Sequence, residues 1–244
     1  MTIPTLEGAE AVLLASTLIE ITSSVTHGVE TIDIFTDLAQ RCVELLPVSA
    51  AGILLRDASD RLQVIGASNP SAHLLDLFQV QNDEGPCLEC SKTGEPVSDE
   101  KLSGNGPWPG FSEQARANGF SATYALPLRS RDLTVGALNL FAKGTLTEGQ
   151  LVIAQALADS ATLSLLQVDP MADLQIVIRR IHVAVESRNT IDQAQGMIAQ
   201  RFSLDVESAY ARLLDVSREA QMSLYQVAYA VVTRDSSSPA ARLL

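Results

Sequence analysis

The stretch IDQAQGMIAQRFSLDVESAYARLLDVSREAQMSLYQVAYAVV, residues 191–232, decides the fold of the C-terminal third of the chain. Its apolar side chains recur at intervals of three and four, which is typical of the buried face of an amphipathic helix. Asp205 stands as an N-cap ahead of one apolar run, and Ser223 with Gln226 forms a capping box ahead of the next. The stretch therefore predicts the end of one helix followed by two shorter helices.

A longer helix is expected upstream, because the same spacing continues back towards Asp169-Pro170, where proline suits the first helical turn. The first half of its seam is apolar enough for a coiled-coil pair between two copies of the chain, whereas Arg188 and Gln195 interrupt the second half. We expect order to end after residue 233, which leaves residues 234–244 as a disordered tail. The expected dimerisation residues are Leu174, Val177, Ile181 and Ala184.

The preceding residues alternate helical and extended patterns. The expected elements are helices at 13–21 and 34–46, strands at 49–56 and 61–67, helices at 72–79 and 112–118, strands at 122–128 and 133–141, and a helix at 146–168. Each pair of strands is joined by a short polar turn, so each pair predicts a hairpin. The order predicts an α+β domain over residues 1–168, with an antiparallel sheet and flanking helices, followed by an all-α domain over 169–233.

Residues 83–109 are dense in glycine and proline, and we expect them to form a loop. This loop contains the pair Cys87 and Cys90, and the third cysteine, Cys42, falls on an expected helix. Three cysteines are too few for a disulfide framework. A metal site is not favoured because no further ligands have suitable spacing. Buried structural cysteine is the favoured interpretation, and a redox pair stays open.

Composition excludes some classes of protein. The chain has 244 residues, of which 46% are hydrophobic, so a disordered chain is excluded. No apolar run reaches the length of a membrane span, which is about 20 residues. The N-terminus carries neither a basic signal-peptide segment nor an Arg-rich transit pattern, so we expect a cytoplasmic protein.

The net charge of −12 argues against nucleic acid as a partner, but the charge is unevenly placed. Eight of the 17 basic residues and nine of the 29 acidic residues lie beyond residue 168, and all eight of those basic residues are arginine. Arginine suits phosphate recognition and stacking on bases. A local surface for nucleic acid is therefore compatible with an acidic total, although a bias towards arginine is also the usual result of a GC-rich genome.

No enzyme signature is present. The sequence lacks a G-x-S-x-G elbow, an H-E-x-x-H motif and a phosphate-binding loop, and it has only three histidines. We therefore expect a protein that is not an enzyme, with no cofactor and no metal.

Gly196 is expected to lie on the inner face of its helix, where it costs about 1 kcal/mol relative to alanine. A close approach of the helix that carries Ala209 and Tyr210 would explain that cost. The polar residues on the opposite face of the Gly196 helix are a solvated surface by default. Together with nearby arginines and Tyr225 they would instead suit a folded RNA backbone and unpaired bases.

The pattern Ala194/Gly196, Ala209/Tyr210/Leu213 and Leu224/Val227/Ala228 resembles the ANTAR domain, the three-helix RNA-binding module of bacterial antitermination regulators. The earlier segments EGPCLEC, TGEPV, SATYALPLR and VGALNLF look like the GAF domain that accompanies ANTAR in actinobacterial regulators. The resemblance implies a GAF sensory domain, with a small ligand still to be identified, and a homodimer whose ANTAR domains bind tandem stem-loops with six-nucleotide loops. The chain departs from the pattern at Gln195, at Gln221-Met222-Ser223 and at Tyr225, where cations are expected, so at least three expected cations are missing. Ser203 replaces a frequent helix-ending glycine.

The expected RNA-binding residues combine arginines for phosphates, polar groups for base edges, and tyrosines for stacking. They are Arg188, Asn189, Gln193, Gly196, Arg201, Tyr210, Arg212, Arg218, Tyr225 and Gln226. The alternative is a small-molecule or redox sensor that acts through protein partners, with the helical tail as a dimerisation module.

Overall fold

A computed structural model describes residues 14–19, 31–57, 59–130, 133–166 and 174–243. Residues 14–19 are helical. The further elements are α2 (Thr31–Leu45), β1 (Ala50–Arg56), β2 (Leu62–Ala67), α3 (Pro70–Asn82), α4 (Pro86–Thr93), β3 (Val97–Asp99), α5 (Pro109–Ala117), β4 (Ala122–Ser130), β5 (Leu133–Ala142), α6 (Glu148–Leu166), α7 (Leu174–Phe202), α8 (Val206–Ala220), α9 (Leu224–Thr233) and η2 (Pro239–Leu243). We call residues 31–166 the N-terminal unit and residues 174–243 the C-terminal unit. The expected α+β unit followed by a helical unit is confirmed.

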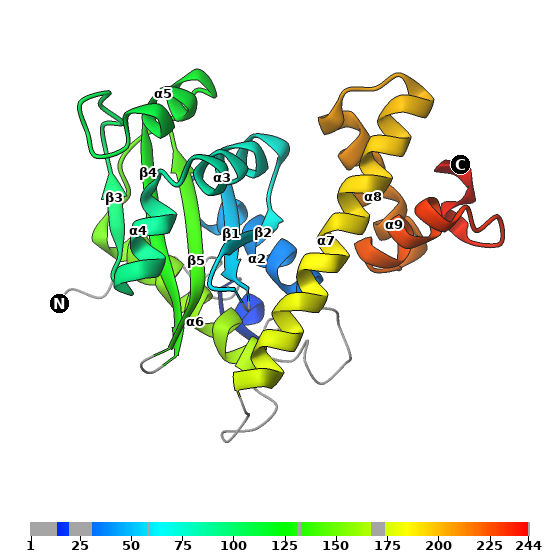
Figure 1. Cartoon of the computed structure of the whole chain (residues 1–244), viewed down its shortest axis with the longest axis horizontal. Coiled ribbons are helices and arrows are strands. Elements are labelled where there is room, and N and C mark those ends of the chain that lie inside the picture. The colour runs from blue at the N-terminus through cyan, green and yellow to red at the C-terminus, as the bar shows by residue number, and fades with distance from the viewer. Residues whose placement is uncertain (1–13, 20–30, 58, 131–132, 167–173, 244) are drawn as a thin grey trace.

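The N-terminal unit is built on one five-stranded sheet in the order β2-β1-β5-β4-β3 (Figure 1). Every neighbouring pair of strands is antiparallel. Both expected hairpins are confirmed, as β1 with β2 and β4 with β5. The pairing of β1 with β5 joins the two hairpins into a single sheet.

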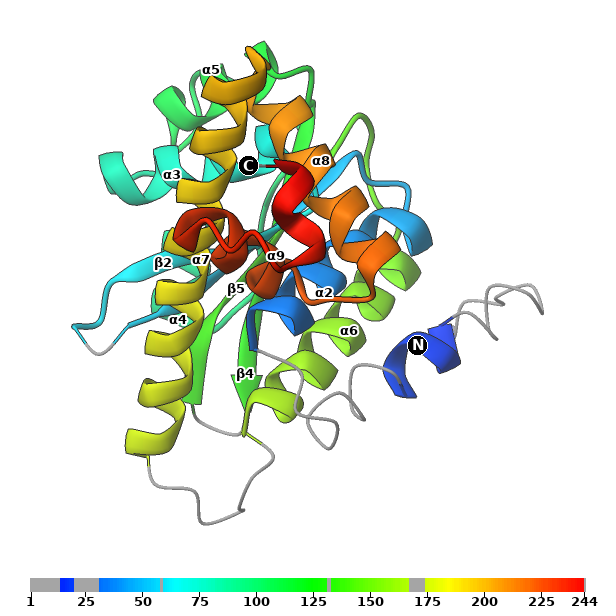
Figure 2. The same ribbon diagram turned by 90° about the vertical axis from the view of Figure 1, so that its right-hand side faces the viewer.

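The sheet is buried on both faces, which explains the nearly continuous apolar strands in the sequence. On β1, Ile53 and Leu55 face one layer of the core, which α2 and α6 cover. Ala50 and Leu54 face the opposite layer, under α3, α4 and α5 (Figures 1 and 2). The alternation follows from the two-residue period of a strand.

Residues 83–109 are not the loop that the sequence predicts. They contain α4 and β3, and α4 is delimited by its own glycines and proline. Gly85 precedes α4 with φ of 149°, Pro86 takes its first position, and Gly94 ends it with φ of 72°. Proline at the start and glycine at the end are typical helix boundaries, so the same residues that suggested a loop instead bound a short helix.

The C-terminal unit is organised around α7, a continuous helix of 29 residues that packs beside the edge strand β2 (Figures 1 and 2). The helix α8 begins where Asp205 accepts a hydrogen bond from the Ser208 N–H at 2.7 Å. The capping box of Ser223 and Gln226 starts α9. Both expected caps are confirmed.

Where the structure describes them, the side chains of the expected coiled-coil seam face the core of their own chain. Ile181 and Ala184 are buried in the core of their own chain, so a second copy is not needed to cover them. The role of these two side chains in dimerisation therefore stays a prediction. The side chains of Leu174 and Val177 lie outside the described residues.

The predicted disordered tail is also corrected. Pro239–Leu243 forms a 3-10 turn that packs against α8 and α9, and it buries Ala240 and Leu243. Arg242 Nη2 donates a hydrogen bond to Glu219 Oε2 of α8 at 2.6 Å. The chain therefore turns back after the serine-rich segment, and apolar side chains beyond it are buried against the C-terminal unit.

Within the described residues, no helix combines the length and the apolar character that crossing a bilayer demands.

Gly136 is required by the sheet, and we expect Gly136→Ala to destabilise the N-terminal unit. A Cβ at this position would lie 2.0 Å from the carbonyl oxygen of Leu54 on the neighbouring strand. Overpacking of this kind costs about 1–3 kcal/mol. Urea unfolding measures the loss, and Gly144→Ala is the control because a Cβ at Gly144 meets nothing within 4 Å. Equal stability of the two variants would contradict the constraint.

Candidate functional site

Two of the expected RNA contacts, Arg188 and Tyr210, lie at the junction between the two units and are buried. Arg188 Nη2 is 2.9 Å from Asp192 Oδ1, and the guanidinium carbon lies 5.9 Å from the centre of the Tyr210 ring. His73 of α3 faces the same cluster, with Nε2 3.8 Å from Asp192 Oδ2. Both side chains are covered in this arrangement, and their assignment as RNA contacts stays a prediction.

The charge state of the junction follows from its burial. Desolvation by burial and, to a smaller extent, the charge of the nearby Arg188 guanidinium together lower the pKa of His73 to about 3. His73 is therefore neutral at pH 7 and forms no ion pair with Asp192. Burial raises the pKa of Asp192, although Arg188 opposes this effect. The cation of Arg188 and the carboxylate of Asp192 are the charged pair of the junction.

The outer face of α7 carries an exposed strip of amide side chains interrupted by a glycine. Asn189, Gln193, Gly196 and Gln200 are all exposed, and their spacings of four, three and four place them on one side of the helix. We call these four residues the amide strip. Three of its members were predicted from the sequence, and Gln200 was not.

Gly196 does not serve the internal packing that the sequence predicts. A Cβ at this position would meet nothing within 4 Å. The helices α7 and α8 pack against each other, and Ala194 of α7 and Ala209 of α8 are both fully buried. Gln195 completes that contact, since its Nε2 donates to the Val206 carbonyl at 2.7 Å. Gly196 lies on the other face because the buried stripe of α7 passes through positions 191, 194, 195 and 198.

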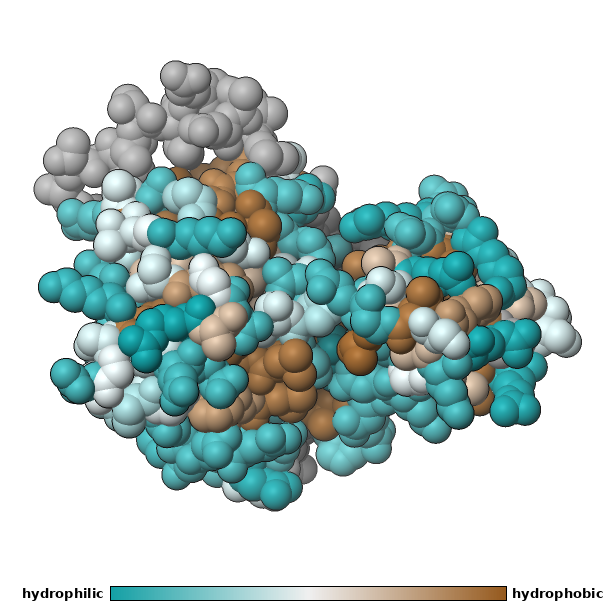
Figure 3. Space-filling view, turned by 90° about the horizontal axis from the view of Figure 1, so that it is seen from above, coloured by the Kyte–Doolittle hydropathy of each residue, from teal (hydrophilic) through white to brown (hydrophobic). Residues whose placement is uncertain are grey.

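Arg201 and Arg212 are exposed and share an aromatic neighbour. The guanidinium carbon of Arg212 lies 4.3 Å from the centre of the Phe202 ring, and that of Arg201 lies 5.8 Å from it. Arg218 is also exposed, on α8. Among the described residues, none of these three arginines has an acidic side chain within ion-pair distance. In Figure 3 the C-terminal unit is the lobe at the right, and its outer rim is largely hydrophilic.

The helix α9 contributes an aromatic pair. The ring centres of Tyr225 and Tyr229 are 5.9 Å apart, and Tyr229 is 53% exposed. Tyr229 was missed in the sequence, although the i, i+4 spacing from Tyr225 could have indicated it. Gln226 has a structural task, because its Oε1 accepts a hydrogen bond from the Ser223 N–H at 3.0 Å.

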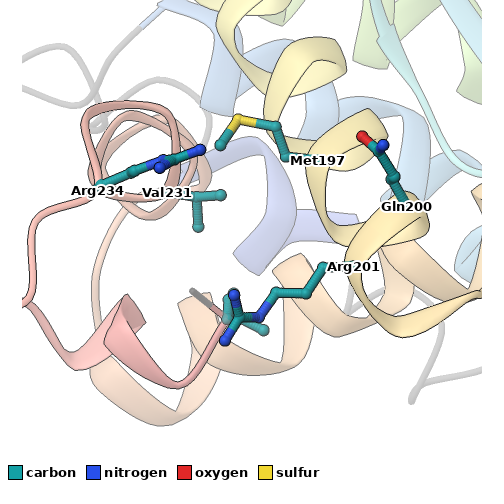
Figure 4. A pocket seen from close by; sticks show the side chains of 6 residues that line it. Met197, Gln200, Arg201, Val231 and Arg234 are labelled. Carbon is teal, nitrogen blue, oxygen red and sulfur yellow. The ribbon is translucent and has the colours of Figure 1, made fainter.

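A pocket of about 400 Å³ opens between the ends of α7 and α9 and the turn η2 (Figure 4). Its lining residues are Met197, Gln200, Arg201, Val231, Arg234 and Leu243. Of these residues, only Arg201 is predicted from the sequence as an RNA contact. Arg234 and Leu243 were missed because they fall in the segment that was expected to be disordered.

The N-terminal unit holds a buried polar cluster centred on Asp76 of α3. Asp76 Oδ1 accepts hydrogen bonds from Asn139 Nδ2 at 2.9 Å and Gln79 Nε2 at 3.1 Å. Asp76 Oδ2 has no hydrogen-bond partner among the described residues. It occupies the space beside Gly52, where a Cβ would lie 1.7 Å from it. Burial raises the pKa of Asp76 to about 7.

The cysteines are free and buried. Burial raises the pKa of Cys42 and of Cys90 to about 12, and it raises the pKa of Cys87 as well. The reactive thiolate form is therefore disfavoured, as expected for structural cysteine. In the part of the chain that the structure describes, no three His, Cys, Asp or Glu side chains are grouped to hold a metal ion.

Comparisons with known proteins identify both units. A GAF domain model matches residues 30–165, and an ANTAR domain model matches residues 179–232. A GAF domain of a phosphoenolpyruvate-protein phosphotransferase from Acinetobacter has 15% sequence identity and a TM-score of 0.51, and the match covers 69% of this chain and 99% of that chain. The corresponding domain from Coxiella burnetii has 16% identity and a TM-score of 0.50, with coverage of 64% and 94%. These likenesses show the fold, and a comparison with curated proteins gives no match.

We expect the free energy of unfolding to depend on pH because of the raised pKa of Asp76. Its pKa is raised from 3.8 to about 7, so between these values the folded protein keeps a proton that the unfolded chain has lost. The free energy of unfolding therefore falls as pH rises across this window, by up to about 1.4 kcal/mol per pH unit from this group. In Asp76→Asn this contribution is absent, so the stability of the variant relative to the unmodified protein rises from pH 4 to pH 7.

Urea unfolding at several pH values measures this difference, with the exposed Asp215→Asn as the control. Parallel pH profiles for Asp76→Asn and the unmodified protein would show that Asp76 titrates normally in the folded state.

Proposed function

Because this chain belongs to the GAF domain family and carries an ANTAR domain after its GAF domain, we propose that it is a cytoplasmic, non-catalytic antitermination regulator. In this proposal the ANTAR domain, which is the C-terminal unit, binds structured RNA. The GAF domain, which is the N-terminal unit, senses a signal and sets the availability of the RNA-binding surface.

The observation that carries the RNA-binding proposal is the exposed, unpaired arginines of the C-terminal unit in a chain of net charge −12. Arg201 and Arg212 flank an aromatic ring on the outer face of the unit. Guanidinium groups bind phosphates through paired hydrogen bonds. The amide strip lies on the same helix as Arg201 and offers donors and acceptors to unpaired base edges.

We further propose that the protein acts as a homodimer on a tandem pair of stem-loops with six-nucleotide loops. Each copy then binds one hairpin, and the second binding event becomes intramolecular. The spacing of the hairpins contributes to specificity in this scheme, because avidity is gained only when both sites can be reached together. The pair Tyr225 and Tyr229 adds a surface for stacking on bases.

The first test uses gel-shift titration of the full-length protein with a tandem two-hairpin RNA, a single hairpin and a scrambled-loop control. We expect a preference for the tandem RNA and a slope of log K against log salt near about −2, if about three arginines contact phosphates. The double variant Arg201→Gln/Arg212→Gln should weaken binding and bring the slope closer to zero by about 1.4. Arg61→Gln removes one such charge from the β1–β2 turn and should change neither.

A salt slope near zero, or equal effects of the two kinds of variant, would contradict this surface. Capture of a protein partner that withstands RNase, without RNA binding, would favour a sensor that acts through protein contacts.

Gly196 provides a second test, in which stability and affinity change in opposite directions. Gly196→Ala should stabilise α7, by up to about 1 kcal/mol, because alanine is the better helix former and its Cβ meets nothing within 4 Å. We expect RNA affinity to fall about tenfold, or about 1.4 kcal/mol, because the Cβ obstructs the approach of RNA to the backbone. Thermal unfolding and gel shift measure the two effects. Unchanged affinity in the stabilised variant would place Gly196 outside the interface.

A further inference from the structure

The pocket at the end of α7 is built from three segments that are distant in sequence. Met197, Gln200 and Arg201 come from α7, Val231 and Arg234 from the end of α9, and Leu243 from η2. Arg234 and Leu243 lie beyond residue 232, where the ANTAR match ends. The pocket is therefore a feature of this chain's own C-terminal segment in addition to its ANTAR domain.

The pocket combines an apolar wall with two cations. Val231 and Leu243 are buried, and Met197 packs against the same core. Arg201 and Arg234 extend into the space from opposite sides (Figure 4). Neither arginine forms an ion pair within the described part of the chain. Among its described lining residues the pocket has two cations and no carboxylate, so it suits a ligand that has both an apolar face and a negative charge.

A nucleotide unit has this chemistry, with a base that can pack against apolar side chains and a phosphate that can bind guanidinium groups. The volume of about 400 Å³ falls within the range of about 300–1,000 Å³ that is typical of small-ligand pockets. Two residues connect the pocket to the surface described above: Gln200 is a member of the amide strip, and Arg201 also lies beside the Phe202 ring. An RNA strand that follows the strip would therefore reach the pocket.

We infer that this pocket receives one unpaired nucleotide of the bound RNA, with the base against Met197, Val231 and Leu243 and the phosphate between Arg201 and Arg234. The inference rests on the proposed RNA-binding function and adds a subsite to it. The turn η2 supplies one wall of this subsite, and its position is fixed by the Arg242–Glu219 hydrogen bond of 2.6 Å and by the burial of Ala240.

The experiment combines protein variants with abasic RNA. A pool of tandem hairpins with randomised six-nucleotide loops first yields a sequence that the full-length protein binds. Six derivatives then each carry an abasic nucleotide at one position of both loops. We expect one abasic position to weaken binding of the unmodified protein about tenfold or more, and we expect Arg234→Gln and Leu243→Ser each to weaken binding of the intact RNA.

The decisive result is the coupling between the two changes. In Arg234→Gln and Leu243→Ser the same abasic substitution should cause little further loss, because the subsite is already impaired. The other abasic positions should weaken the variants as they weaken the unmodified protein. Arg234 is exposed, so its variant remains informative if Leu243→Ser disturbs the turn. Arg61→Gln is the control for charge, and circular dichroism confirms folding.

Four outcomes would overturn the inference. Additive losses at every abasic position would show that the pocket and the bases act independently. RNA binding that depends on Arg201 and Arg212 but stays unchanged in both pocket variants would remove the subsite and leave the proposed function intact. Binding of free nucleoside monophosphates in equilibrium dialysis, lost in Arg234→Gln while RNA binding is unchanged, would make the pocket a small-ligand site. Absence of any hairpin binding would remove the proposed function and the inference together.

Discussion

The helix α7 is the constraint on which the arrangement of the whole molecule depends. One buried stripe along this helix serves two units, since Ile181 and Ala184 pack towards the N-terminal unit and Ala194 and Ile198 pack inside the C-terminal unit. A continuous helix transmits orientation as well as distance, so the packing of its first half determines which way its second half faces. The amide strip is exposed because the opposite side of the helix is the one that packs against the two units. Movement of one unit against the other therefore requires that α7 bend or that its first half leave the sheet.

The junction around Arg188 is chemically different from the cores on either side of it. Its centre is a buried guanidinium paired with a carboxylate whose side chain is 37% exposed, next to a neutral His73. Removing such charges from water costs free energy, and attraction to a partly exposed partner offsets only part of that cost. The apolar layers under the sheet carry no such cost. Among the contacts of α7, the polar junction is thus the one that gains the least free energy from burial. The same junction covers Arg188 and Tyr210, two of the side chains suited to RNA.

The sequence predicts local structure well wherever a short-range rule decides it. The caps at Asp205 and Ser223 depend on residues three positions apart, and both hairpins depend on polar turns between apolar runs. The prediction failed where long-range contacts decide. Only the tertiary structure shows that Gly196 faces outward and Arg188 inward, because helical periodicity gives the faces of a helix without saying which unit covers each. The C-terminal turn depends on its contact with Glu219, which lies 23 residues away from Arg242.

The placement of the arginines reconciles an acidic chain with an RNA partner. Arg201 follows Arg188 by 13 residues, so at 1.5 Å per residue it lies about 20 Å further along α7. That distance exceeds two Debye lengths at physiological salt, each about 8 Å, so the acidic groups beside Arg188 are largely screened from a phosphate bound at Arg201. Arg188 lies against that unit and is covered by it. The far end of α7 can therefore bind RNA while the units stay in contact, whereas any contribution from Arg188 or Tyr210 requires that they separate. In the function that we propose, this separation would link signal sensing by the GAF domain to RNA binding by the ANTAR domain, through the residues that it exposes.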